Sequence, residues 1–155
     1  MSNQYNLNPE IKDRQHWMRI LATAPVDTLE TAWRSLEDKP GYTMLRTPEV
    51  GMAMVRGRAG GTGGRFNLGE MTLTRCVVRL KDGTTGHAYV AGRDKRKTEL
   101  AAAFDAMLQT SGYRENLNRT LIQPLETQQT ANRKQRSQKV QSTRVDFFTM
   151  VRGEG

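Results

Sequence analysis

The sequence predicts an α+β fold: an antiparallel four-stranded meander with helices packed on one face, plus an extended C-terminal arm. Apolar residues recur at helical spacing before residue 40 and after residue 94, and they alternate with strand periodicity between these points. After Pro124 the chain becomes polar and basic. We therefore assign residues 1–122 to an α+β body and residues 123–155 to the arm.

Two helices are expected before the strands. The first has four apolar residues on one face, namely Trp17, Ile20, Leu21 and Ala24. It ends at Pro25, after which Asp27 and Glu30 form a variant of the capping box. The second helix repeats the apolar spacing with Leu29, Ala32, Trp33 and Leu36. Residues 39–41, Lys-Pro-Gly, end it.

The strands are expected at 42–46, 50–56, 71–80 and 85–91. Thr47-Pro48-Glu49 separates the first pair, and a tight Asp-Gly turn joins the last pair. In the third strand Met71 and Leu73 have one parity, whereas Cys76, Val78 and Leu80 have the other. A β-bulge near Thr74 or Arg75 would bring both sets to a common face.

A glycine-rich loop connects the second and third strands. Four of the fourteen glycines lie in it: Gly60, Gly61, Gly63 and Gly64. Glycine favours sharp turns and close approach of another molecule to the backbone, so we expect an exposed connection with Arg58 and Arg65 at its mouth. It matches neither a Walker loop nor a dinucleotide fingerprint. A glycine hairpin without a ligand remains an open alternative.

A third helix is expected from Asp94, its N-cap, to Gly112. Its buried stripe consists of Leu100, Phe104, Met107 and Leu108. The first turn carries Lys95, Arg96 and Lys97, although exposed cations at this end of a helix cost about 0.3–1 kcal/mol each. The turn could hold an anion through cations and backbone N–H groups, or it could be an ordinary solvated charge run.

The arm follows a short amphipathic piece that ends at Pro124. No acidic residue lies between Glu126 and Asp146, so this stretch is either disordered or a helix supported by something else. The chain then ends in an apolar segment with Val145, Phe147, Phe148 and Met150. Such a segment is an aggregation liability in water. Docking onto another subunit and return to its own core are both open.

Bulk properties limit the possible functions. The 155 residues suffice for one core, and the formal net charge of +8 favours an anionic partner without selecting among them. One cysteine excludes an intrachain disulfide framework and fits a reducing compartment. With neither a signal sequence nor a stretch long enough to span a bilayer, we expect a cytoplasmic protein without a membrane partner.

Catalytic constellations are not evident. His16 and His87 lack metal-ligand spacing to another histidine, cysteine or carboxylate, and Cys76 has the setting of a small core residue. We therefore expect no catalytic residue and no metal site on this chain. From its residues alone the chain is predicted to be a binding or assembly subunit.

Several sequence blocks, in order along the chain, resemble the PhnG family, the G subunits of the bacterial carbon–phosphorus lyase complex. They lie at 14–18, 60–63, 65–66, 69–75, 78–80, 90–95 and 144–154. The resemblance implies a cytoplasmic hetero-oligomer with the H, I and J subunits, present in two copies each, and the I subunit as most direct partner. It also implies transfer of the ribose triphosphate moiety of MgATP to an alkylphosphonate, with displacement of adenine.

The resemblance places the active centre on the I subunit, and the iron–sulfur cluster and S-adenosylmethionine on the J subunit. This chain alone is therefore expected to bind no cofactor. The candidate anion contacts are Arg58, Arg65, Arg75, Arg93 and Lys95. The candidate partner interface consists of Gly60, Gly61, Gly63, Gly64, Phe66, Val145, Phe147, Phe148 and Met150. The alternative is a basic nucleic-acid-binding module. The sequence contains no recognition motif for nucleic acid, so we expect no nucleic acid as a partner.

Overall fold

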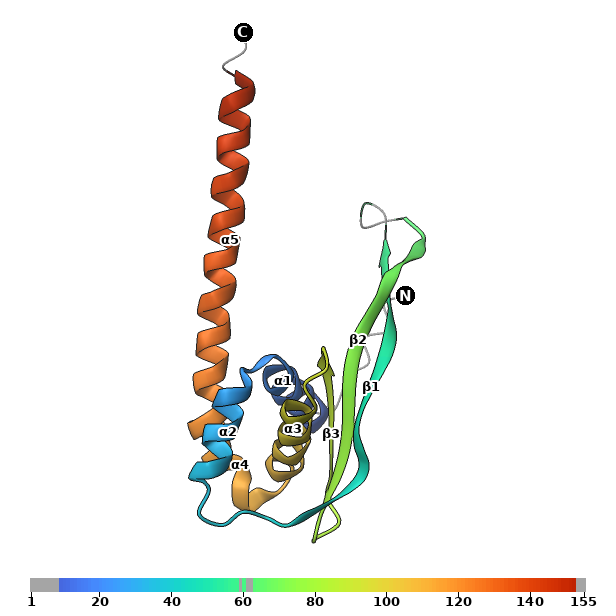
Figure 1. The fold of residues 1–155 in the computed structure, drawn as a ribbon. Helices are drawn as coiled ribbons and strands as arrows, with labels where there is room; N and C mark the ends of the chain where they lie inside the picture. The colour runs from blue at the N-terminus through green and yellow to red at the C-terminus, as the bar shows by residue number, and fades with distance from the viewer. Residues whose placement is uncertain (1–8, 59, 61–62, 153–155) are drawn as a thin grey trace.

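The computed structural model describes the backbone of residues 9–58, 60 and 63–152, and the side chains of residues 10–58, 60 and 63–143. Two N-terminal helices precede the sheet, α1 (Pro9–Thr23) and α2 (Val26–Ser35). The strands are β1 (Tyr42–Arg58), β2 (Arg65–Leu80) and β3 (Thr85–Ala91). The remaining elements are α3 (Lys95–Leu108), α4 (Ser111–Leu117), the π-helical η2 (Asn118–Ile122) and α5 (Gln123–Arg152). Figure 1 shows helices against one side of the sheet and a long hairpin and α5 projecting from this body.

Within the described residues the sheet has three antiparallel strands in the order β1-β2-β3, so the predicted four-stranded meander is wrong by one strand. The two strands expected at 42–46 and 50–56 are one, because β1, with 17 residues, pairs along its length with the 16 residues of β2, from Tyr42–Leu80 to Arg58–Arg65. Register shifts between Met44 and Arg46 and between Arg46 and Glu49 absorb the extra residues. Pro48 is tolerated because β1 is an edge strand, where a missing N–H donor need not break the ladder.

The β-bulge predicted near Thr74 or Arg75 is also wrong. β2 pairs with β3 without a shift from Leu73–Ala91 to Arg79–Thr85. Thr74 is fully buried on the core side, and its hydroxyl donates to the Gly92 carbonyl at 2.7 Å. Thr74, with its hydroxyl hydrogen-bonded, therefore occupies the core-facing position that the bulge was expected to give to an apolar residue. Met71 and Leu73, which have the other parity, lie on the opposite face of the sheet.

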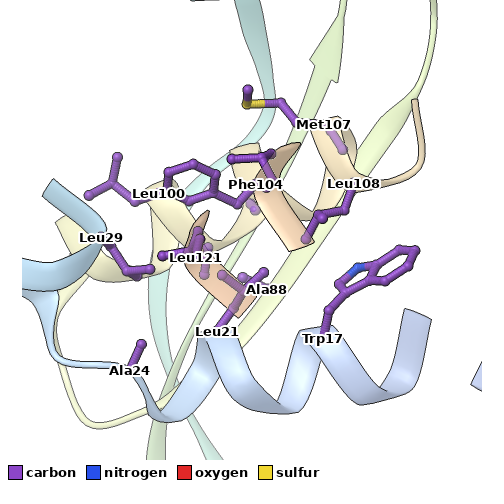
Figure 2. Close-up of a cluster of buried hydrophobic side chains, with 14 of the residues drawn as sticks. Trp17, Leu21, Ala24, Leu29, Ala88, Leu100, Phe104, Met107, Leu108 and Leu121 are labelled. Carbon is purple, nitrogen blue, oxygen red and sulfur yellow. The ribbon is translucent and has the colours of Figure 1, made fainter. Parts of the chain in front are cut away.

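The core lies between the sheet and the helices, as Figure 2 shows for side chains from α1, α2, α3, β3 and η2. Phe104 and Leu29 are 0 % exposed and Trp17 is 4 % exposed, which confirms the predicted apolar faces of the three helices. Such burial contributes on the order of 1.5–3 kcal/mol for each large side chain.

Two capping expectations have different outcomes. Asp94 is the N-cap of α3, since its carboxylate accepts the Lys97 backbone N–H at 2.9 Å. Asp27 is not a cap, because α2 begins at Val26 with Pro25 in the N-cap position. Asp27 instead lies in the first turn, where its negative charge still favours the helix dipole.

Pro124 does not end the helix, contrary to expectation. The preceding η2 is π-helical, and the Gln123 N–H donates to the Asn118 carbonyl five residues back. This wider turn accommodates a proline ring that would clash in regular α-helix. α5 then continues to Arg152, so the arm is a helix. Leu125 is buried and the Gln129 side chain donates to the Ile20 carbonyl at 3.0 Å, which anchors the first turns of α5 to the body.

Candidate functional site

The tip of the β1–β2 hairpin is cationic. Arg58 and Arg65 oppose each other across the ladder and, with Arg56 and Gly57, line a hollow of about 290 Å³. The connection predicted between them is confirmed, and Gly60 has φ +62°, a conformation that suits glycine. Gly61 lies outside the described residues, as do residues 59 and 62. No described carboxylate forms an ion pair with Arg58 or Arg65, so their charge is available to a ligand or partner.

The start of α3 forms a second basic patch. The Gly92 N–H donates to the Thr72 carbonyl at 2.9 Å, which fixes the β3–α3 connection against β2. Gly92 has φ +96°, a value that favours glycine, and Arg93 and Lys95 follow it as exposed residues. Among the side chains that the structure describes, no carboxylate pairs with either of these two cations.

The other cations of this turn are already engaged. Arg96 lies 2.6 Å from the Glu30 carboxylate and 3.4 Å from that of Glu99, and the hydrogen bond to Glu30 raises the pKa of Arg96. Lys97 is half-buried, and this desolvation lowers its pKa. Arg96 therefore joins α3 to α2, which leaves Arg93 and Lys95 as the exposed cations without such a partner.

Arg75, the fifth candidate anion contact, lies in the middle of the sheet. Its Nε donates to the Glu49 carboxylate at 3.0 Å, and Arg46 approaches the same carboxylate at 3.7 Å. Glu49 thus partly neutralises two arginines on the face opposite the core. An anion would have to compete with Glu49 for Arg75.

The candidate anion contacts do not form a single cluster within this chain. Arg65 and Thr72, the contact point of the α3 start, are seven positions apart along β2, which at a rise of roughly 3.3 Å per residue corresponds to about 23 Å. The structure pairs Arg58 with Arg65 and places Arg93 near Lys95, but it leaves these two patches apart.

The candidate partner residues also lie in two regions. Gly60, Gly63, Gly64 and Phe66 belong to the hairpin tip, and Phe66 is 45 % exposed. Val145, Phe147, Phe148 and Met150 lie in the last part of α5, and their side chains are outside the described residues. Figure 1 shows this end of the helix far from the body, so the return of this segment to its own core is not seen here.

A sequence model of the family described as phosphonate metabolism protein PhnG matches residues 12–153. The chain belongs to the PhnG family. It is 42 % identical over 144 residues to the alpha-D-ribose 1-methylphosphonate 5-triphosphate synthase subunit PhnG of Rhizobium meliloti (strain 1021), and the alignment covers 93 % of this chain and 92 % of the relative. The resemblance drawn from the sequence blocks is therefore confirmed.

One polar cluster of this PhnG-family member was missed by sequence reasoning. Asp105 is 0 % exposed in the buried face of α3. Its carboxylate accepts from the Arg14 guanidinium, the Trp17 indole and the His87 backbone N–H, each at 2.9 Å. The hydrogen bond to Asp105 raises the pKa of Arg14. The sequence did contain a signal for this cluster, because Asp105 is the one acidic residue in the otherwise apolar run 100–108. A carboxylate buried in such a run requires hydrogen-bonding or charged partners.

The cysteine and histidine considered as a nucleophile and a metal ligand contribute to packing and to contacts between helices. Cys76 is 1 % exposed, as predicted, and burial raises the pKa of its thiol to about 11. His16 lies 3.2 Å from the Glu126 carboxylate at the junction of α1 and α5. In the described part of the chain, no three histidine, cysteine or acidic residues are grouped so that they could hold a metal ion. None of its helices is both long and apolar enough to cross a membrane.

Proposed function

We propose that this chain is an accessory subunit of the bacterial carbon–phosphorus lyase core complex. In that role it supports transfer of the ribose triphosphate moiety of MgATP to an alkylphosphonate, with displacement of adenine. The observation that carries the proposal is the 42 % identity, over 93 % of the chain, to a subunit of alpha-D-ribose 1-methylphosphonate 5-triphosphate synthase. Because 92 % of the relative is covered as well, the two chains correspond over nearly their whole lengths.

The partners in this proposal are the I, H and J subunits, with the I subunit in most direct contact, two copies of each subunit, and a cytoplasmic location. This chain binds no cofactor by itself. MgATP is the substrate of the complex, whereas the iron–sulfur cluster and S-adenosylmethionine belong to another subunit. The hairpin tip and the apolar end of α5 contact partners, a role favoured by the projection of both from the body in Figure 1.

Positive charge is the contribution of this chain to the reaction. A triphosphate needs cations that stay in place while adenine leaves, and preorganised charges in a water-poor interface stabilise anions most effectively. Arg93 and Lys95 meet this need at the start of α3, because both are exposed and no described carboxylate pairs with them. Arg65 lies about 23 Å along β2 from Thr72, the residue that contacts the start of α3. We therefore assign the tip arginines to the partner.

The test uses the complex assembled by co-expression of this chain with the I, H and J subunits. Adenine release from MgATP and methylphosphonate is measured with and without the chain, and the proposal expects release only when the chain is present. Adenine release at an equal rate by the I, H and J subunits without this chain would overturn the accessory role.

Charge reversal separates the anion-binding role from assembly. Arg93→Glu with Lys95→Glu should leave the complex intact and slow adenine release at least about tenfold, the effect of roughly 1.4 kcal/mol in the barrier. Arg79→Glu with Lys81→Glu, at the opposite end of the sheet, is the matched control. Loss of assembly would instead assign Arg93 and Lys95 to salt bridges with an acidic subunit, and unchanged release from the intact complex would refute the pocket role.

A further inference from the structure

The large apolar side chains that are exposed to solvent are concentrated on one hairpin. Of the twelve among the described residues, nine lie on β1 or β2: Met44, Leu45, Val50, Met52, Met54, Val55, Phe66, Leu68 and Met71. Most of these belong to the outer hairpin, defined here as residues 50–58 and 65–72. An apolar concentration of this kind on one element marks an interaction surface, whereas single exposed apolar residues need no explanation.

The outer hairpin lacks support from the rest of the fold. β3 pairs with β2 only as far as Leu73, and the Gly92–Thr72 hydrogen bond is the last contact of that ladder before the chain turns into α3. Beyond this point β1 and β2 continue as two strands, which Figure 1 shows as a projection from the body. Two-stranded hairpins are marginally stable in water by themselves. The projection therefore gains order from whatever covers it.

Both faces of the outer hairpin are apolar and uncovered. Met52 opposes Thr72 and is 66 % exposed, on the face that continues from buried Thr74. Leu68 lies across Gly57 on the other face, since a β-carbon on Gly57 would be 2.7 Å from its Cδ1, and it is 62 % exposed. A flat partner could cover only one of these faces. A groove that takes the hairpin edge-on would cover both.

Charge indicates the kind of partner. The described charged residues of the outer hairpin are Arg56, Arg58, Arg65 and Glu70, and no described carboxylate pairs with the three arginines. A second copy, in a chain of net charge +8, would bring the same cations together. Acidic side chains around an apolar groove would complement this surface and direct the tip into place.

We propose that the outer hairpin inserts as a tongue into an apolar groove of a different subunit, with acidic residues at the bottom of the groove facing the tip arginines. This inference rests on the proposed function, because that function supplies the different subunit. It assigns the interface to the two faces of the strands, whereas the sequence pointed only to the glycine loop, Phe66 and the chain's end.

Site-specific photo-crosslinking in the co-expressed complex with the I, H and J subunits tests the insertion. A benzophenone side chain is placed at Met52, at Leu68 or, as control, at Ile11, an exposed apolar residue of α1. We expect Met52 and Leu68, on opposite faces, to crosslink to the same different subunit, and Ile11 to give no such product. Crosslinks to a second copy of this chain, to phospholipid vesicles added to the complex, or from one face only would overturn the insertion.

Substitution supplies an independent readout. Met52→Thr with Met54→Thr should weaken co-purification with the other subunits on the order of a hundredfold, as loss of central interface side chains does. The isolated chain should keep its thermal midpoint, because both side chains are more than half exposed. Ile11→Thr is the control and should change neither. An intact complex with the double variant would overturn the proposal alone, whereas failure of the wild-type chain to join the complex would overturn the proposed function as well.

Discussion

The backbone of Gly86 on β3 lies against α3 so closely that a β-carbon at this position would be 2.0 Å from the Ala102 carbonyl oxygen. The same β-carbon would be 2.8 Å from the β-carbon of Ala106. Small residues on both elements thus set the distance between the sheet and α3, and this spacing buries Phe104 and Leu100 completely. The alanine-rich sequence of α3 serves this close approach.

Gly86→Ala is expected to destabilise the protein by about 3 kcal/mol, the upper part of the usual range for overpacking, because the close atoms are backbone and cannot rotate away. Urea unfolding of the isolated chain measures the change. Gly112→Ala in α4 is the control, since a β-carbon there meets nothing within 4 Å and alanine is the better helix former. Equal stability of the Gly86 variant and the wild-type chain would contradict this packing.

Asp105→Asn should destabilise the fold by about 2–3 kcal/mol, below the 3–5 kcal/mol typical of a broken buried pair because Arg14 is partly solvated. The amide offers one acceptor oxygen where the carboxylate serves three donors from α1 and β3, so a buried N–H loses its partner. Thermal unfolding followed by tryptophan fluorescence reports the change. The matched substitution Asp13→Asn, on the exposed face of α1, should shift stability by no more than about 0.5 kcal/mol.

The N-cap of α3 gives a smaller expected effect. Asp94→Ala removes the acceptor of the Lys97 N–H and should cost about 1 kcal/mol, whereas Asp94→Asn retains an acceptor and should cost little. Denaturant unfolding of the two variants measures the difference. If both variants lost the same stability, the charge at the start of α3 and not the cap would be the cause.

Local sequence patterns were sufficient to predict the elements that depend only on residues near one another in the chain. The apolar stripes of α1 and α3, the Asp94 cap and the Asp-Gly turn depend on neighbours in sequence, and each lies as expected. The single long strand β1 could not be predicted this way. Its continuity through Thr47-Pro48 depends on pairing with β2, and a proline in isolation favours a break.

The bulge expected in β2 was wrong for an instructive reason. It assumed that every apolar residue of the strand belongs to the chain's own core, which would require Met71 and Cys76 on one face. The structure buries Cys76 and leaves Met71 43 % exposed. In a subunit with partners, a second apolar face is a surface for another chain. Sequence periodicity alone cannot distinguish such a face from one that belongs to the chain's own core.

The separation of the two cationic patches could not be predicted from the sequence either, because it depends on the length of β2.

Stability should fall at alkaline pH through two acidic side chains, the buried Cys76 and the partly buried Tyr42. Burial raises the pKa of Cys76 from 9.0 to about 11, and burial together with the hydrogen bond to Glu99 raises the pKa of Tyr42 from 10.0 to about 12. The unfolded chain therefore loses these protons first, so the stabilisation is complete below pH 9 and is lost as pH rises through 11 and 12. Urea unfolding between pH 8 and about 10.5 should show this decline, with a shallower slope for Cys76→Ala.

The burial of Cys76 should also protect its thiol from chemical modification. A thiol reagent at pH 8 should modify Cys76 only as the protein unfolds. Rapid modification of the folded chain would contradict the burial of this side chain.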